Sequence, residues 1–136
     1  MRHVLFVDDD IRLIATFVDG VREAGFRTHH VRSPDDALDY LRKKNSAADV
    51  IVWDMMLPPG KVFREIDTES GLSTGKHLYQ AMRQLKPEAY YILLTARGDV
   101  TFEEFDDPQM RSFVRSKTDL GVTGLADFIK DLYRES

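Results

Sequence analysis

The sequence predicts a doubly wound α/β fold with a five-stranded parallel sheet, and two observations carry this prediction. Five short β-prone segments alternate with segments whose apolar residues recur at helical spacing, which is the pattern of βαβ units. The first, third and fourth β-prone segments are continuously apolar, whereas the second and fifth contain charged or polar residues. Because strands buried on both faces lie inside a sheet and mixed strands lie at its edges, the expected strand order is 2-1-3-4-5.

Length and composition exclude several classes of protein. The chain has 136 residues, which suits one domain over residues 1–136, and it contains no cysteine, so disulfides and thiolate metal sites are excluded. A net charge of −4 argues against a nucleic-acid-binding surface. No apolar run approaches the ~20 residues that span a bilayer, and Val4–Val7 is far too short for the apolar region of a signal peptide. We therefore expect a cytoplasmic protein that binds neither nucleic acid nor membrane.

The first strand is expected over Arg2–Val7, and three aspartates, Asp8 to Asp10, follow it at once. The next segment is predicted to be a helix that begins at an aspartate N-cap and ends at Gly25. Since one aspartate is enough for a cap, the other two are candidates for chemistry. The apolar stripe of this helix consists of Ile11, Ile14, Val18, Val21 and Ala24.

The second strand, Arg27–Val31, is polar and short, which favours an edge position. It contains His29 and His30, and with no matching ligand nearby in the sequence we expect both to be solvated. A second helix is predicted from Ser33 as N-cap and Pro34 at the first helical position to about Asn45. Its apolar face consists of Ala37, Leu38 and Leu41.

The third strand, Asp49–Trp53, is an apolar run that ends at Asp54 and is followed by a proline turn. Beyond it, residues 57–74 form a connection much longer than the ~2–6 residues usual in α/β units, so we interpret them as an inserted loop. Within this loop Val62, Phe63 and Ile66 are compatible with a hairpin or a short helix. The loop itself is either a solvated connection or a lid or recognition element.

The last half of the chain contains two further strands, Tyr90–Thr95 and Arg111–Lys117. A helix is expected from about Ser73 to a point before Pro87, and another around Val100–Phe105. The C-terminal helix is predicted from Leu125, Phe128, Ile129 and Leu132, with Thr123 as a possible cap.

In the order 2-1-3-4-5, which is the flavodoxin-like order, strands 1 and 3 end side by side at the switch point where ligands bind. Asp8, Asp9 and Asp54 are then expected to converge. Because three close carboxylates repel one another, a hard divalent cation such as Mg²⁺ is their natural partner. Thr95 and Lys117 end the neighbouring strands and offer a hydroxyl and an ammonium. This set of groups suits a phosphoryl group held against Asp54, whose carboxylate can act as a nucleophile.

These residues resemble the receiver domain of two-component response regulators over nearly the whole chain. The matching positions are Val7 to Asp10, Asp54 with Pro58, Leu94 to Ala96, and Lys117. The resemblance implies that Asp54 is the phosphoacceptor and that Mg²⁺ is bound by Asp9, Asp54 and the backbone carbonyl of Met56, with Asp8 acting mostly through water. It further implies that Thr95 and Lys117 contact the phosphoryl oxygens.

The function implied is that of a stand-alone receiver that is not a turnover enzyme but promotes its own phosphotransfer and dephosphorylation. The donor would be a histidine kinase or a histidine phosphotransfer protein. The output would be a downstream protein effector that binds within Val100–Tyr133, and the receiver would be a monomer or a weak homodimer.

Three positions depart from the receiver pattern. Thr118 stands where proline usually follows the lysine, so a trans bond is expected there. Val114 occupies the usual aromatic position, with Phe113 beside it, and the glycine expected soon after the Asp-Pro turn appears only at Gly75. One alternative is a receiver-like scaffold that is never phosphorylated. A second is a small phosphatase of the haloacid-dehalogenase type, since Asp8 and Asp10 resemble its nucleophile motif.

Overall fold

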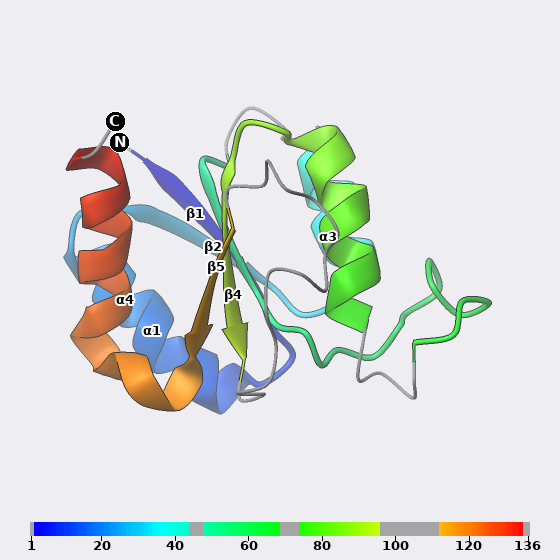
Figure 1. Ribbon diagram of the computed structural model, residues 1–136, viewed down its shortest axis with the longest axis horizontal. Helices are drawn as coiled ribbons and strands as arrows, with labels where there is room; N and C mark the ends of the chain where they lie inside the picture. Colours follow the sequence, from blue (N-terminus) through cyan, green and yellow to red (C-terminus); the bar gives the residue numbers. More distant parts are fainter. Residues whose placement is uncertain (1, 44–47, 69–73, 96–111, 135–136) are drawn as a thin grey trace.

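The computed structural model describes residues 2–43, 48–68, 74–95 and 112–134, with the backbone alone at 95 and 112–123. Five parallel strands form one sheet in the predicted order β2-β1-β3-β4-β5 (Figure 1). None of the described helices is both long and apolar enough to cross a membrane. The elements are β1 (His3–Val7), α1 (Ile11–Glu23), β2 (Arg27–Val31), α2 (Pro34–Lys43), β3 (Val50–Trp53), α3 (Thr74–Leu85), β4 (Tyr90–Thr95), β5 (Ser112–Ser116) and α4 (Lys117–Arg134).

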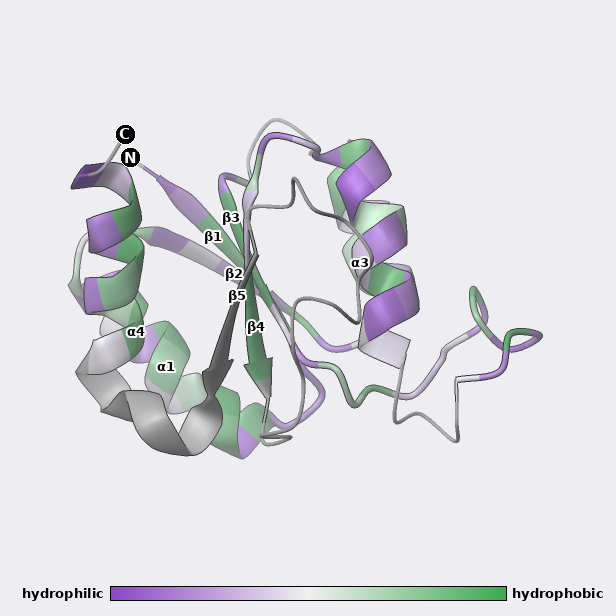
Figure 2. Ribbon diagram, in the orientation of Figure 1, coloured by the Kyte–Doolittle hydropathy of each residue, from purple (hydrophilic) through white to green (hydrophobic). Residues whose placement is uncertain are grey.

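The helices cover the sheet on both faces, with α1 and α4 on one side and α2 and α3 on the other (Figure 1). Alternate residues of each central strand point to opposite faces, so β1 buries Leu5 and Val7 beneath α2 and α3 but Val4 and Phe6 beneath α1 and α4. Figure 2 shows apolar residues on the strands and on the inner faces of the helices. The continuous apolar runs are therefore strands buried on both faces, as predicted.

The ends of α1 and α2 follow the predicted local signals. The Asp10 side chain accepts a hydrogen bond from the Leu13 amide at 3.1 Å, and the Ser33 hydroxyl accepts one from the Asp36 amide at 3.1 Å. After α1, Gly25 has a φ of +102°, and its amide donates to the Arg22 carbonyl. This left-handed glycine ends the helix, because residues with a Cβ rarely adopt such a φ.

The C-terminal part differs from the prediction in two respects. β5 ends at Ser116 and Lys117 is the first residue of α4, so the predicted strand is one residue too long at this end. The cap predicted at Thr123 was wrong, because Thr123 lies inside α4. Threonine and glycine lower helix propensity by only ~1 kcal/mol or less, which does not end a helix whose later turns pack Leu125 and Ile129 on the sheet. The helix predicted around Val100–Phe105 lies outside the described residues.

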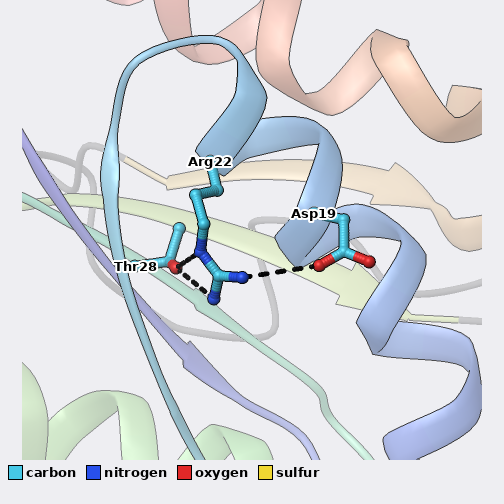
Figure 3. Close-up of polar contacts among 3 residues, drawn as sticks. All are labelled: Asp19, Arg22 and Thr28. Carbon is cyan, nitrogen blue, oxygen red and sulfur yellow. Dashed lines mark hydrogen bonds and ion pairs between the residues drawn. The ribbon is translucent and has the colours of Figure 1, made fainter.

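β2 is an edge strand, as predicted, and polar contacts join it to α1. Arg22 donates to the Thr28 hydroxyl from Nε at 3.2 Å and from Nη2 at 3.0 Å, while its Nη1 lies 3.6 Å from the Asp19 carboxylate (Figure 3). These groups are exposed, so each contact adds little to stability. Through its two bonds to Thr28, Arg22 links the polar strand to the end of α1.

Behind β2, the imidazole of His3 lies in a small aromatic cluster. Its Nε2 is 3.0 Å from the Tyr40 hydroxyl, and Tyr40 stacks on His29 with ring centroids 4.3 Å apart. Burial lowers the pKa of His3 below its usual 6.5, helped by the nearby charges of His29 and Arg27, while Asp49 opposes the shift. The folded protein thus resists protonation of His3 more than the unfolded chain does.

A pH dependence of stability follows. Below about pH 6.5 the unfolded chain binds a proton that folded His3 resists, so the free energy of unfolding falls as the pH drops toward the lowered pKa. Urea denaturation from about pH 7.5 to about pH 5.5 should show a steeper loss of stability in wild type than in His3→Gln. Parallel curves for the two proteins would contradict this origin.

The long connection after β3 is anchored to α2. The carboxylate of Asp35 accepts hydrogen bonds from the amides of Lys61 and Val62, both at 2.9 Å, and the side chain of Phe63 is buried with the core under α2 and α3. Residues 60–65 form turns rather than a hairpin or a helix, so both predicted alternatives were wrong. Of the predicted loop 57–74, residues 69–73 lie outside the described part.

Candidate functional site

The backbone brings two aspartates to one edge of the sheet. Asp8 directly follows β1 and Asp54 directly follows the neighbouring strand β3. The Asp54 amide donates to the Val7 carbonyl at 3.2 Å, and the Asp8 amide donates to the Val31 carbonyl at 3.1 Å. Both aspartates therefore extend the parallel hydrogen-bond ladder by one step, which fixes their positions at the carboxyl end of the strands.

Asp8, Asp9 and Asp54 form an acidic cluster, in which one carboxylate oxygen from each lies within 4.8 Å of the others. Asp8 is 2% exposed and Asp54 is 6% exposed, whereas Asp9 is open to solvent. Short local bonds orient the two buried acids, since Asp8 Oδ1 accepts from the Asp10 amide at 2.8 Å and Asp54 Oδ1 accepts from the Met56 amide at 3.2 Å. The convergence predicted from strand order is thus present.

The donor set of this cluster fits a Mg²⁺ ion. Mg²⁺ prefers carboxylate oxygens, and ligands bound at about 2.0–2.1 Å on opposite sides of the ion lie about 4 Å apart. The three carboxylate oxygens lie within 4.8 Å of one another, which is close to the spacing at which side chains share one ion. A divalent cation would also offset the mutual repulsion of three carboxylates, two of them buried.

The third aspartate of the run has a different task. The Asp10 side chain caps α1 by accepting the Leu13 amide, so it is engaged at the helix terminus rather than in the cluster. One of the three aspartates was predicted to cap the helix, and the local pattern does not distinguish among them. The structure assigns Asp10 to the cap and leaves Asp8 and Asp9 for the acidic cluster.

The prediction that both histidines of β2 are solvated was half wrong. His29 is exposed, as expected, but His30 is partly buried and its Nε2 lies 2.7 Å from the Asp8 carbonyl oxygen. Because His30 lies next to Val31, whose carbonyl accepts the Asp8 amide, both ends of the Asp8 backbone bond to the end of β2. The spacing of metal-ligand residues in the sequence does not reveal this histidine, because it contacts a backbone group.

Three further predicted site residues are placed by their backbone. Thr95 is the last residue of β4, and the register pairs it with Ser116 of β5, directly before Lys117. Met56 is 40% exposed beside Asp54. All three lie at the edge of the sheet that carries the acidic cluster. The roles of Thr95, Lys117 and the Met56 carbonyl remain predictions. The trans bond expected after Lys117 is confirmed, because the described backbone contains no cis peptide bond.

Gly75 packs directly on the backbone next to Asp54. Its amide donates to the Met55 carbonyl at 2.8 Å, and its own carbonyl accepts the buried Trp53 indole N–H at 3.0 Å. A Cβ on Gly75 would lie 2.4 Å from Met55 Cα and 2.5 Å from the Asp54 carbonyl oxygen. Although the inserted loop places this glycine 21 positions after Asp54, it still packs against the backbone of the candidate site.

Trp53 places a natural optical reporter next to the cluster. It is the only tryptophan of the chain, it precedes Asp54, and it is buried between Tyr79, stacked at 5.3 Å, and Tyr91, edge-on at 5.9 Å. Burial raises the pKa of Tyr91, whose hydroxyl donates to the Lys86 carbonyl at 2.7 Å. Changes in charge at Asp54 should therefore alter the fluorescence of a single, rigidly held indole.

No family model and no curated protein match this sequence. Solved structures do match in fold. A response regulator receiver domain from Clostridium thermocellum shares 17% identity at a TM-score of 0.75, with 99% of this chain and 96% of that chain covered. A putative response regulator from Chloroflexus aurantiacus shares 22% identity at a TM-score of 0.72, with 96% of each chain covered.

A third similar structure is a response regulator from Thermotoga maritima that was solved with Mg²⁺-BeF. It shares 20% identity at a TM-score of 0.69, with 97% of this chain and 99% of that chain covered. Identities this low establish the fold alone. The sheet order, the helices on both faces and these matches together show that the chain has the CheY-like fold of response regulator receiver domains.

Proposed function

We propose that this protein is a response regulator receiver that accepts a phosphoryl group on Asp54 in a Mg²⁺-dependent phosphorelay. The observation that carries the proposal is the acidic cluster, in which buried Asp54 lies beside Asp8 and Asp9 at the carboxyl end of the sheet. The receiver fold supports it, because ligands of doubly wound sheets bind at this edge. The protein is a phosphoacceptor rather than a turnover enzyme.

In the proposed reaction, a carboxylate oxygen of Asp54 bonds to phosphorus as the bond between phosphorus and the donor atom breaks. Asp8, Asp9, Asp54 and the Met56 carbonyl would hold Mg²⁺, which when bound neutralises charge on the phosphoryl oxygens. Thr95 and Lys117 would bind those oxygens from the neighbouring strands. The bond from the Met56 amide to Asp54 Oδ1 holds the carboxylate in a fixed orientation.

The phosphoryl donor in this proposal is a histidine kinase or a histidine phosphotransfer protein, and the output is contact with a downstream protein. A newly bound phosphoryl group must favour one of two arrangements of the chain if a partner is to detect it. The similar structure from Thermotoga maritima contains Mg²⁺-BeF, which suggests the ligand with which to test this chain.

Beryllofluoride is expected to bind wild type in the presence of Mg²⁺, because it mimics a phosphoryl group on a carboxylate. Isothermal titration calorimetry measures the binding, and Asp54→Asn should abolish it since the amide lacks the anionic oxygen. Absence of binding to wild type, or equal binding to Asp54→Asn, would refute the proposed phosphoacceptor. Omitting Mg²⁺ should also abolish the signal.

A further inference from the structure

We propose that His30 is a positioning residue of the acidic cluster, which holds the peptide between Asp8 and Asp9 in place for cation binding. The inference deepens the proposed function and rests on it for the identity of the cation. It comes from one contact, the 2.7 Å approach of His30 Nε2 to the Asp8 carbonyl oxygen. Neither the composition nor the helical periodicity of the sequence pointed to this contact.

The direction of the hydrogen bond follows from its chemistry. A carbonyl oxygen can only accept, so Nε2 of His30 must carry the hydrogen and donate it. The ring reaches across from the edge strand β2 to the residue that follows β1, and it is partly buried there. This shielding from water makes the bond worth more than a solvated one.

The bonded carbonyl belongs to the peptide that joins Asp8 to Asp9. The orientation of this peptide therefore affects the relative positions of the two Cα atoms from which the side chains extend. The amide on the other side of Asp8 is held by the Val31 carbonyl at 3.1 Å. The last two residues of β2 therefore fix the backbone of Asp8 at both ends. Without the donor of His30, the Asp8 carbonyl loses its bond to β2, and the peptide between Asp8 and Asp9 is held less firmly in the orientation that aligns both acids with Asp54.

Outer groups that orient metal ligands commonly change metal affinity by 10–100-fold when they are removed. We expect the lower end of that range here, because His30 acts on a backbone already held by Val31. His30→Met keeps the bulk of the side chain without a donor and should weaken Mg²⁺ binding about 10-fold. His30→Gln keeps an N–H donor at a similar reach and should stay close to wild type.

The matched control is His29→Met, which changes the neighbouring histidine that points to the other face of β2 and stacks on Tyr40. It should leave Mg²⁺ affinity unchanged. The affinity is measured with Mg²⁺ alone by Trp53 fluorescence and by calorimetry, and urea denaturation of each variant reports stability separately. A purely structural role for His30 would lower stability in His30→Met without changing the Mg²⁺ affinity of the folded protein.

Wild-type affinity in His30→Met, or loss of affinity in His30→Gln equal to that in His30→Met, would overturn the role of His30. Nuclear magnetic resonance of the wild-type ring nitrogens offers a test without any variant, since a proton found only on Nδ1 would exclude the bond. Failure of the proposed function is distinguishable. A wild type that binds Mg²⁺ but takes no phosphoryl group refutes the phosphoacceptor alone, whereas one that binds no Mg²⁺ refutes both proposals.

Discussion

Replacing Asp54 with asparagine is expected to abolish phosphorylation by acetyl phosphate. Wild type, incubated with acetyl phosphate and Mg²⁺, should gain one phosphoryl group as acetate leaves, because a buried carboxylate oxygen attacks phosphorus. Asparagine has nearly the same size, and its side-chain oxygen can still accept the Met56 amide, so the turn should be preserved. Its neutral amide is too weak a nucleophile to react. Intact mass spectrometry measures the gain directly.

Two controls make the result for Asp54 specific. Asp36→Asn changes an exposed acid on α2 outside the acidic cluster and should be phosphorylated like wild type. Removing Mg²⁺ with a chelator should prevent the reaction in every variant.

In the absence of cation, Asp54→Asn should melt at or above the wild-type temperature, because one of three repelling charges is gone. No mass gain in wild type would favour the unphosphorylated scaffold.

Gly75→Ala is expected to destabilise the fold by about 3 kcal/mol or more. The added Cβ would lie 2.4 Å from Met55 Cα and 2.5 Å from the Asp54 carbonyl oxygen, and both are backbone atoms that cannot rotate away. Either α3 moves outward, which breaks the bonds of Gly75 to Met55 and Trp53, or the strand end that carries Asp54 shifts. Urea denaturation followed by Trp53 fluorescence measures the loss.

The matched comparison is Gly25→Ala. Gly25 has a left-handed φ of +102°, but a Cβ there meets nothing within 4 Å, so only the backbone strain of about 1–2 kcal/mol is expected. If the two variants lost equal stability, the contact between Gly75 and the strand end would be unimportant. Whatever fraction of Gly75→Ala remains folded should also bind Mg²⁺ more weakly, because Asp54 lies on the displaced backbone.

The strand order was predictable because the pattern of apolar and polar residues in each strand indicates whether the strand is central or at an edge of the sheet. Ile51 and Val52 are adjacent in the sequence and bury into opposite faces of the sheet, which is why a run of apolar residues suffices to identify a central strand. Helix caps such as Ser33 depend on residues only three or four positions away, so they could also be predicted from the sequence. The cap assigned to Thr123 failed because tertiary packing extends α4 across weak helix formers.

The site was predictable in part. The presence of Asp8, Asp9 and Asp54 at strand ends followed from the pattern, but the distances between their oxygens did not. The inserted loop shows the same limit, since its anchoring to Asp35 of α2 is a pair of backbone bonds between segments more than 20 residues apart. Nothing in the local pattern of residues 57–74 indicates that partner.

The sequence by itself determined the sheet, its order and the acids at its carboxyl edge, because burial patterns and caps are properties of neighbouring residues. Only the tertiary structure decided that Asp10 caps α1, that His30 bonds to Asp8 and that Gly75 packs on Met55. The contacts of His30 and Gly75 depend on distances between residues that are far apart in the sequence. The cap depends on which of three adjacent aspartates reaches the Leu13 amide. Periodicity carries no information about such distances, and packing alone sets them.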